Sequence, residues 1–206
     1  MFIQIIQGKC TKQEELKAAM DRWREECEPG ALGFLGGTYG FTDDDIFCAV
    51  VRFETREAAR MNSARPDQGR WWQSVEPLFD GPVEFHDCED VLLMLDGGSD
   101  EAGFVQVLRG RVRDPQKLRS MMDRVSTILH EERPEIIGAT IAIEPDGTFT
   151  ETVAFTDEAA ARAGESKDMP AELGALVSDV FMEDTSYLDL HHPWFATHAQ
   201  GSQSGR

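Results

Sequence analysis

The sequence predicts an α+β protein built from two βαββαβ repeats, whose antiparallel sheets pack together as an α/β barrel within one chain. Three observations predict this fold. The chain contains an internal repeat, and both copies show the same order of strand and helix patterns. Each copy would form a sheet with helices on one face, and its other face must be buried against a second sheet. The 206 residues also suffice for two units of about 100 residues each.

The internal repeat has an offset of 102 residues, because Phe2–Lys9 matches Phe104–Arg111. The same offset aligns Leu16 with Leu118, Met20–Arg22 with Met122–Arg124, and Ala58–Arg60 with Ala160–Arg162. Several matches in one register and one order indicate a duplication. We therefore expect one repeat at 1–97 and another at 102–195, joined by a polar, glycine-rich link and followed by a disordered tail at 196–206.

The first copy begins with Phe2–Lys9, which is rich in aliphatic residues and predicts a strand. Thr11 followed by Glu14 has the spacing of a capping box, which predicts the start of a helix. Apolar residues then recur at helical spacing, and the helix is expected to end at Pro29.

The remaining elements of the first copy are two strands, two short helices and a final strand. Leu32–Phe41 and Ile46–Phe53 flank an acidic turn and predict a hairpin. Thr55 predicts the N-cap of a short helix, and Pro66 separates this helix from a second one. One long strand is expected at Val83–Leu95, either regular or with a bulge near Cys88.

The second copy shows the same order of elements. They are a strand at Phe104–Arg111, a helix at Asp114–His130, a hairpin of Ile136–Ile143 and Phe149–Phe155, helices around Asp157–Gly164 and Pro170–Phe181, and a strand at Thr185–Leu190. This order, β-α-β-β-α-β, is that of the ferredoxin-like split βαβ unit. Two such units can bury their bare sheet faces together, which places the helices outside.

These elements carry a resemblance to a known family. The strand Phe2–Gly8, the helix Glu14–Cys27, the turn Pro29–Phe34 and the junction Phe53–Ala58 resemble the antibiotic-biosynthesis-monooxygenase-like branch of the dimeric α/β-barrel superfamily, here in tandem-duplicated form. The stretch Arg65–Trp72 is similar to one found in uncharacterised tandem proteins of actinobacteria. The resemblance covers nearly the whole chain.

The resemblance implies a small-molecule-binding α/β-barrel protein. The superfamily includes cofactor-independent oxygenases, isomerases, haem-degrading enzymes and stress-induced proteins without assigned chemistry, so the fold does not fix the function. If the protein is an enzyme, the resemblance implies a monooxygenase or isomerase that acts on a hydrophobic or aromatic metabolite without a cofactor. One alternative is a non-catalytic structural or stress-related interaction protein, and a second is haem binding.

Haem binding is disfavoured by three positions of the sequence. The haem-degrading branch has an asparagine on its first strand, and a tryptophan and a histidine before its last strand. Here Gln7 stands at the strand position, Met61 lies nearest the tryptophan position, and Gly69–Trp72 contains no histidine. We therefore expect no cofactor.

In the family, the ligand pocket lies between the sheet and the helices of each unit, and the first copy is rich in aromatic residues there. Phe34, Trp71, Trp72 and Phe85 are the candidate ligand contacts. Adjacent helical residues point about 100° apart, so only one of the paired tryptophans can face a pocket directly. The alternative is ordinary core packing.

Polar residues in the predicted strands supply the remaining candidates. Gln7 is a candidate ligand contact, and the alternative is a hydrogen bond between strands. Arg52 and Arg109 could each bind a carboxylate or phenolate group of a ligand, and the alternative is an internal salt bridge. His86 is the candidate catalytic base, since histidine exchanges protons near neutral pH, and the alternative is a structural role. The adjacent Asp87 should point to the opposite face of the strand.

Composition and charge exclude some classes of binding partner. There are 38 acidic and 20 basic residues, a net charge of −18, which disfavours nucleic acids and anionic membranes. The absence of a leader-like or membrane-length apolar run predicts a cytoplasmic protein. The four cysteines form no Cys-x-x-Cys pair, and His191 with His192 diverge on an extended segment, so no metal site is expected. The duplication predicts a monomeric pseudo-dimer or a homodimer.

Overall fold

The fold was analysed in a computed structural model that describes residues 1–182 and 184–197. The first half contains β1 (Phe2–Lys9), α1 (Gln13–Glu26), β2 (Phe34–Phe41), β3 (Ile46–Phe53), α2 (Arg56–Ser63), α3 (Pro66–Val75), β4 (Glu84–Cys88) and β5 (Asp90–Met94). The second contains β6 (Phe104–Arg111), α4 (Pro115–Glu132), β7 (Ile136–Ile143), β8 (Thr148–Phe155), α5 (Glu158–Glu165), α6 (Ala171–Val180), β9 (Ser186–Leu190) and β10 (Trp194–Thr197).

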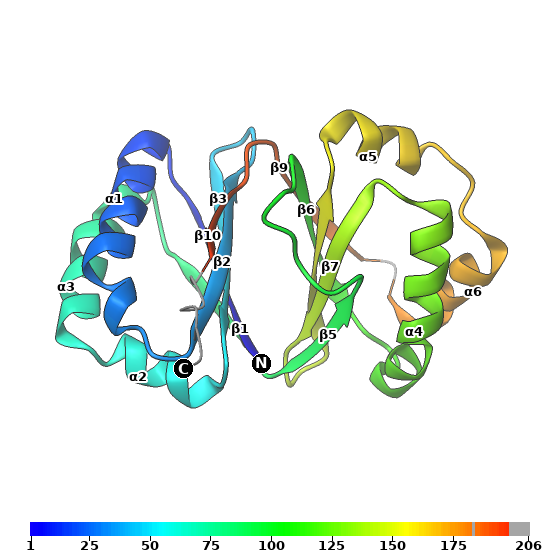
Figure 1. The fold of residues 1–206 in the computed structure, drawn as a ribbon, viewed down its shortest axis with the longest axis horizontal. Coiled ribbons are helices and arrows are strands. Elements are labelled where there is room, and N and C mark those ends of the chain that lie inside the picture. Colours follow the sequence, from blue (N-terminus) through cyan, green and yellow to red (C-terminus); the bar gives the residue numbers. More distant parts are fainter. Residues whose placement is uncertain (183, 198–206) are drawn as a thin grey trace, which may run out of the picture.

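The strands form two five-stranded antiparallel sheets, in the orders β10-β2-β3-β1-β4 and β5-β7-β8-β6-β9. Figure 1 shows the sheets facing each other at the centre of the molecule, with α1, α2 and α3 on one outer side and α4, α5 and α6 on the other. The predicted fold class, two ferredoxin-like units joined as an intramolecular α/β barrel, is confirmed.

Each half of the chain contributes one strand to the sheet of the other half. β4 pairs with β1 in the first sheet, whereas β5, which starts only two residues after β4 ends, pairs with β7 in the second sheet. In return, β10 pairs with β2 in the first sheet. The expected single strand Val83–Leu95 was therefore wrong, because the chain crosses between the sheets at Glu89.

The repeat boundaries at residues 1–97 and 102–195 stay a prediction. They describe the duplication in the sequence, whereas the two sheets exchange β5 and β10. The expected disordered tail starts too early, since Ala196 and Thr197 belong to β10. Its remainder, from residue 198, lies outside the described residues.

Three apolar layers hold the barrel together, because alternate side chains of each strand point to opposite faces. One layer fills the space between the first sheet and its helices, and one fills the same space in the second unit. The third lies between the sheets and includes Ile3, Ile5, Val50, Val105 and Val107. No helix of the described residues is long and apolar enough to cross a membrane.

The helix caps follow the sequence in α2 but not in α1. The Thr55 hydroxyl accepts a hydrogen bond from the amide of Ala58, as predicted, and Asp157 caps α5 in the same way. The capping box at α1 was wrong: the helix begins after Lys12, and the Thr11 amide donates instead to the Asp80 carboxylate at 2.7 Å.

Candidate functional site

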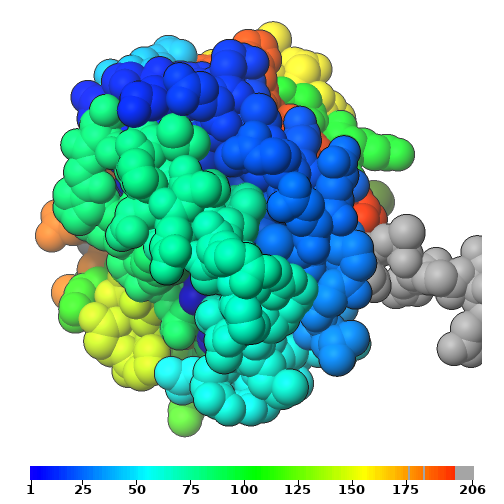
Figure 2. All heavy atoms as spheres, turned by 90° about the vertical axis from the view of Figure 1, so that its left-hand side faces the viewer, coloured from blue at the N-terminus to red at the C-terminus, as the bar shows by residue number. Residues whose placement is uncertain are grey.

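A cavity of about 270 Å³ lies between the first sheet and its helices. Strand alternation builds its floor, because every second residue of β1 and β3 faces the helices. The floor includes Gln4 and Ile6 of β1 and Phe47, Ala49 and Val51 of β3. The helices α1, α2 and α3 cover this face of the sheet (Figure 2).

Two indole groups fix the helices that roof this cavity. Trp23 of α1 donates a hydrogen bond to the Gln68 side chain of α3 at 2.6 Å. Trp71 of α3 donates to the carbonyl of Ala19 in α1 at 2.8 Å. These bonds join α1 to α3 in both directions, so the roof keeps its position over the sheet.

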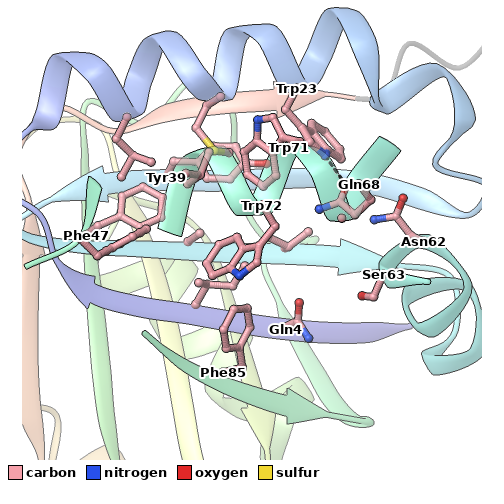
Figure 3. Close-up of a pocket in the computed structure, with 18 of the residues that line it drawn as sticks. Gln4, Trp23, Tyr39, Phe47, Asn62, Ser63, Gln68, Trp71, Trp72 and Phe85 are labelled. Carbon is pink, nitrogen blue, oxygen red and sulfur yellow. Dashed lines mark hydrogen bonds between the residues drawn. The ribbon is translucent and has the colours of Figure 1, made fainter. Parts of the chain in front are cut away.

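Trp72 is the wall of the cavity. Its ring lies 5.3 Å from that of Phe85, edge to face at 69°, and 6.2 Å from the rings of Phe79 and Trp71. Unlike Trp23 and Trp71, its indole N–H has no hydrogen-bond partner among the described residues. Figure 3 shows Trp72 between α3 and the strands, next to Phe85. An aromatic ring on the cavity wall with an available donor suits a flat ligand.

The polar groups of the cavity gather at one end. Figure 3 shows Asn62, Ser63 and Gln68 together at one side and Phe47 at the other. Tyr39 is 2% exposed, and burial raises the pKa of its hydroxyl, so it stays protonated at neutral pH. The cavity thus offers hydrogen bonds at one end and apolar surface elsewhere.

The aromatic candidates from the sequence meet at this cavity, with one exception. Trp71, Trp72 and Phe85 line it, so the expectation that only one of the paired tryptophans would face the pocket was wrong. Phe34 lies behind the lining, 1% exposed, with its ring 5.1 Å from Trp23 and 5.7 Å from Phe53. Phe34 therefore supports the wall rather than forming it.

The polar candidates lie on the other face of the sheets. Gln7 of β1 pairs with Cys48 and Glu84 and points away from the helices, because it alternates with Gln4 and Ile6. Arg52 of β3 donates to Thr38 at 3.0 Å, and burial lowers the pKa of its guanidinium. Neither residue belongs to the lining of the cavity.

Arg109 and His86 form a cluster between the two sheets. Arg109 Nη2 lies 3.0 Å from His86 Nδ1 and 2.7 Å from the Glu144 carboxylate. His86 Nε2 has no hydrogen bond and lies 3.5 Å from Glu84. As expected, Asp87 points the other way, and it accepts a hydrogen bond from Gln4 at 2.8 Å. His86 thus faces the sheet interface, not a cavity.

A second cavity, of about 730 Å³, lies between the second sheet and its helices. It is wider because smaller residues stand at the aromatic positions of the first unit. Val125 occupies the position of Trp23 in the repeat, and Val177 has the same place in α6 that Trp72 has in α3. Both valines line this second cavity.

Glu151 of β8 lies on the floor of the second cavity, at the repeat position of Ala49. Its cross-strand neighbours are Leu108 and Ile141. The side chain is half-buried and faces the cavity, and its carboxyl has no hydrogen-bond partner among the described residues. Desolvation raises the pKa of Glu151 from its ordinary value of 4.5 to about 7.

The sequence analysis missed Glu151, although a signal for it exists. In β8, Phe149, Val153 and Phe155 alternate on the face toward the helices, and Glu151 falls in the same series. Burying a single carboxylate among apolar residues costs free energy of folding unless the carboxylate has a partner. Such a residue is therefore a candidate for a functional site.

His191 contacts one carboxylate of each unit. Its Nδ1 lies 2.8 Å from Glu158 and its Nε2 lies 3.5 Å from Asp43. In residues 1–182 and 184–197, no group of three or more histidine, cysteine, aspartate or glutamate side chains is placed to hold a metal ion.

Several solved structures have a fold similar to that of this chain. A candidate monooxygenase from Lactobacillus acidophilus is 12% identical, with a TM-score of 0.72 and 95% of both chains covered. An anthrone oxidase-like protein is 10% identical, with a TM-score of 0.67, over 100% of this chain and 96% of that one. A ferredoxin-fold protein from Listeria monocytogenes, related to antibiotic biosynthesis monooxygenases, is 9% identical, with a TM-score of 0.52, over 93% and 94%.

These structures cover both units of the chain, so they share the duplicated barrel and not only one half of it. The predicted resemblance to monooxygenase-like ferredoxin-fold proteins is confirmed at the level of fold. The similarity to actinobacterial tandem proteins stays a prediction. No family model and no curated protein matches the sequence.

Proposed function

We propose that this protein binds a compact, flat, apolar aromatic molecule in the cavity of its first unit. The ring of Trp72, which lies on the wall of a cavity of about 270 Å³ and edge to face with Phe85, carries the proposal. This volume lies just below the range of about 300–1,000 Å³ typical of sites for drug-sized ligands, which favours a smaller molecule. A cavity of this volume between the sheet and its helices also favours ligand binding over a purely structural role.

The reaction we propose is oxygenation of the bound molecule by dioxygen. Structural neighbours described as a monooxygenase and as anthrone oxidase-like support this reaction class. An activated methylene group that loses both hydrogens and gains one oxygen atom as a carbonyl leaves the other oxygen atom as water. Because the substrate supplies all the electrons, this reaction balances without a separate reductant.

The described lining residues limit the substrates for this reaction. Apart from Tyr39, which stays protonated, none of them is an acid or base that titrates near neutral pH. The cavity therefore contributes orientation, water exclusion and the polar end at Asn62 and Gln68, and the substrate must already have an acidic C–H group. His86 is left out, because it lies on the opposite face of the sheet.

Anthrone, a tricyclic ketone with an acidic methylene group, is the probe for the test. We expect saturable quenching of tryptophan fluorescence by anthrone under argon. Trp72→Ala should weaken binding at least about tenfold, since it removes a buried ring and an aromatic pair. Val177→Ala, at the matching position of the second unit, should leave binding unchanged.

Admitting oxygen then tests the reaction. We expect dioxygen uptake and formation of the quinone to exceed the rate without protein, and Trp72→Ala to abolish the excess. Equal anthrone binding by the wild type and Trp72→Ala would refute the binding proposal. Binding without faster oxidation would refute oxygenation of this substrate class and retain the binding role. A haem titration without a Soret shift would exclude the haem alternative.

We also propose that the working unit is the monomer, which already contains both halves of the barrel, and that it acts in the cytoplasm. The four unpaired cysteines support a reducing compartment. Native mass spectrometry at micromolar concentration tests the first point: a mass of 23.0 kDa is expected, and twice that mass would indicate a homodimer.

A further inference from the structure

The second cavity contains a charge that the first cavity lacks. Glu151 lies at its floor, surrounded along and across the sheet by Phe149, Val153, Leu108 and Ile141. Ala49 stands at the same repeat position in the first cavity. The two cavities therefore differ in chemistry as well as in size, and one ligand class would not suit both.

We propose that the second cavity binds a hydrophobic amine, with the Glu151 carboxylate as counter-ion to its ammonium group and the apolar walls around its hydrocarbon body. This site is independent of the aromatic site proposed for the first unit. The two fail separately, because different residues and different probes test them.

The position of Glu151 relative to the other charges supports this ligand class. The other charged residues of the lining are exposed at the rim or half-buried: Arg113, Glu132, Arg133, Glu165, Lys167 and Asp168. Arg133 pairs with Glu135, and Arg113 contacts the Ser178 carbonyl at 3.4 Å. No described cation is paired with Glu151, so the positive charge that would stabilise its ionised form must come from a ligand.

The walls determine the rest of the ligand. Met122, Val125 and Leu129 of α4 and Leu173 and Val177 of α6 face the sheet across the cavity. A space of about 730 Å³ with such walls admits a long or branched hydrocarbon group. A ligand anion would meet the Glu151 carboxylate, and the net charge of −18 would also repel it at a distance.

The binding should depend on pH in a defined direction. An alkylammonium ion remains charged between pH 6 and 8, whereas Glu151 ionises across this range. The charged groups that face the cavity with it are those of the rim, and the neutral polar residues of the lining are Gln106, Ser178, Thr185 and Tyr187. Amine affinity should therefore rise about tenfold from pH 6 to pH 8, and alcohol affinity should not.

n-Octylamine and n-octanol are the probes, measured by isothermal titration calorimetry on the full chain. At pH 8, Glu151→Gln should lower the affinity for octylamine at least about tenfold, with octanol affinity changed less than about threefold. Glu132→Gln, which removes a rim carboxylate, should change octylamine affinity less than about twofold. Trp72→Ala should leave octylamine binding to this cavity unchanged.

A measurement on the unmodified protein guards against a variant that fails to fold. We expect the pKa of Glu151, followed by carboxyl carbon NMR, to fall by at least one unit when octylamine saturates the protein. Three results would each overturn the proposal: no saturable octylamine binding at pH 8, equal octylamine affinity in Glu151→Gln, or an affinity that decreases from pH 6 to pH 8. The last result would indicate a neutral ligand that accepts a hydrogen bond from the protonated acid.

Discussion

The guanidinium of Arg109 contacts His86 Nδ1 at 3.0 Å and so joins β6 of the second sheet to β4 of the first. It also bonds Glu144 at 2.7 Å, and the side chains of Arg109 and Glu144 are 26% and 19% exposed. Arg109→Met leaves that carboxylate without its cation, so we expect the free energy of unfolding to fall by about 1–3 kcal/mol, measured by urea denaturation.

Arg111→Met is the control for this prediction, because Arg111 pairs with Asp146 at the surface, where the side chains are 58% and 60% exposed. Its effect should stay within about 0.5 kcal/mol. Equal losses in the two variants would show that the contact between the sheets contributes little.

Glu151 should make stability fall as the pH rises. Its pKa is about 7 in the folded protein and near 4.5 in the unfolded chain, so between these values the folded state holds a proton that the unfolded state has lost. The free energy of unfolding therefore decreases from pH 4.5 to pH 7, by at most about 3 kcal/mol.

Glu151→Gln cannot titrate, so its stability relative to the wild type should rise over the same pH window and level off on either side. Urea denaturation of both proteins at pH 5 and pH 8 measures this difference, in which the other titrating groups cancel. Parallel pH profiles would mean that water reaches the carboxyl and hydrates it.

Trp194 should be important for the stability of the exchanged strand β10. Its ring stacks on Tyr39 at 5.8 Å and on Phe41 at 5.7 Å. Trp194→Ala should lower the free energy of unfolding by about 2–4 kcal/mol in urea denaturation. Leu93→Ala on the other exchanged strand, at a side chain that is 48% exposed, should cost no more than about 0.5 kcal/mol. A loss of similar size in both would contradict this assignment.

The cysteines should be unreactive in the folded protein. Cys10, Cys27, Cys48 and Cys88 are at most 1% exposed. Burial raises the pKa of each thiol, to about 12 for Cys48 and Cys88. Because the thiolate is the reactive form, a disulfide reagent at pH 8 should modify all four only after unfolding in urea. Rapid reaction of one thiol in the native protein would reveal local opening near it.

The sequence predicts local elements here better than their partners. Most strands and helices follow from periodicity, and the repeat of Phe2–Lys9 at Phe104–Arg111 predicts the pairing of the two units. The crossing at Glu89 was not predictable, because Cys88 and Asp90 flank it without a turn signal. Only the tertiary arrangement shows that β5 pairs with β7 rather than with its own sheet.

The site was partly predictable for the same reason. Trp71, Trp72 and Phe85 come together at a cavity. They were predicted to do so because the ligand pocket of the family that the sequence resembles lies between the sheet and the helices. Gln7 and His86 lie on the wrong side of their strands for that cavity, which strand alternation would have indicated. Glu151 was equally predictable from its strand, because the same alternation places it toward the helices.

The exchange of β5 and β10 has a consequence for how this chain can evolve. In a homodimer of identical subunits, every substitution changes both binding sites at once. Here the two halves are covalently joined and each completes the other's sheet, so the two cavities belong to one chain and are lined by different residues. A substitution can then change one cavity alone, as the difference between Ala49 and Glu151 at the same repeat position illustrates.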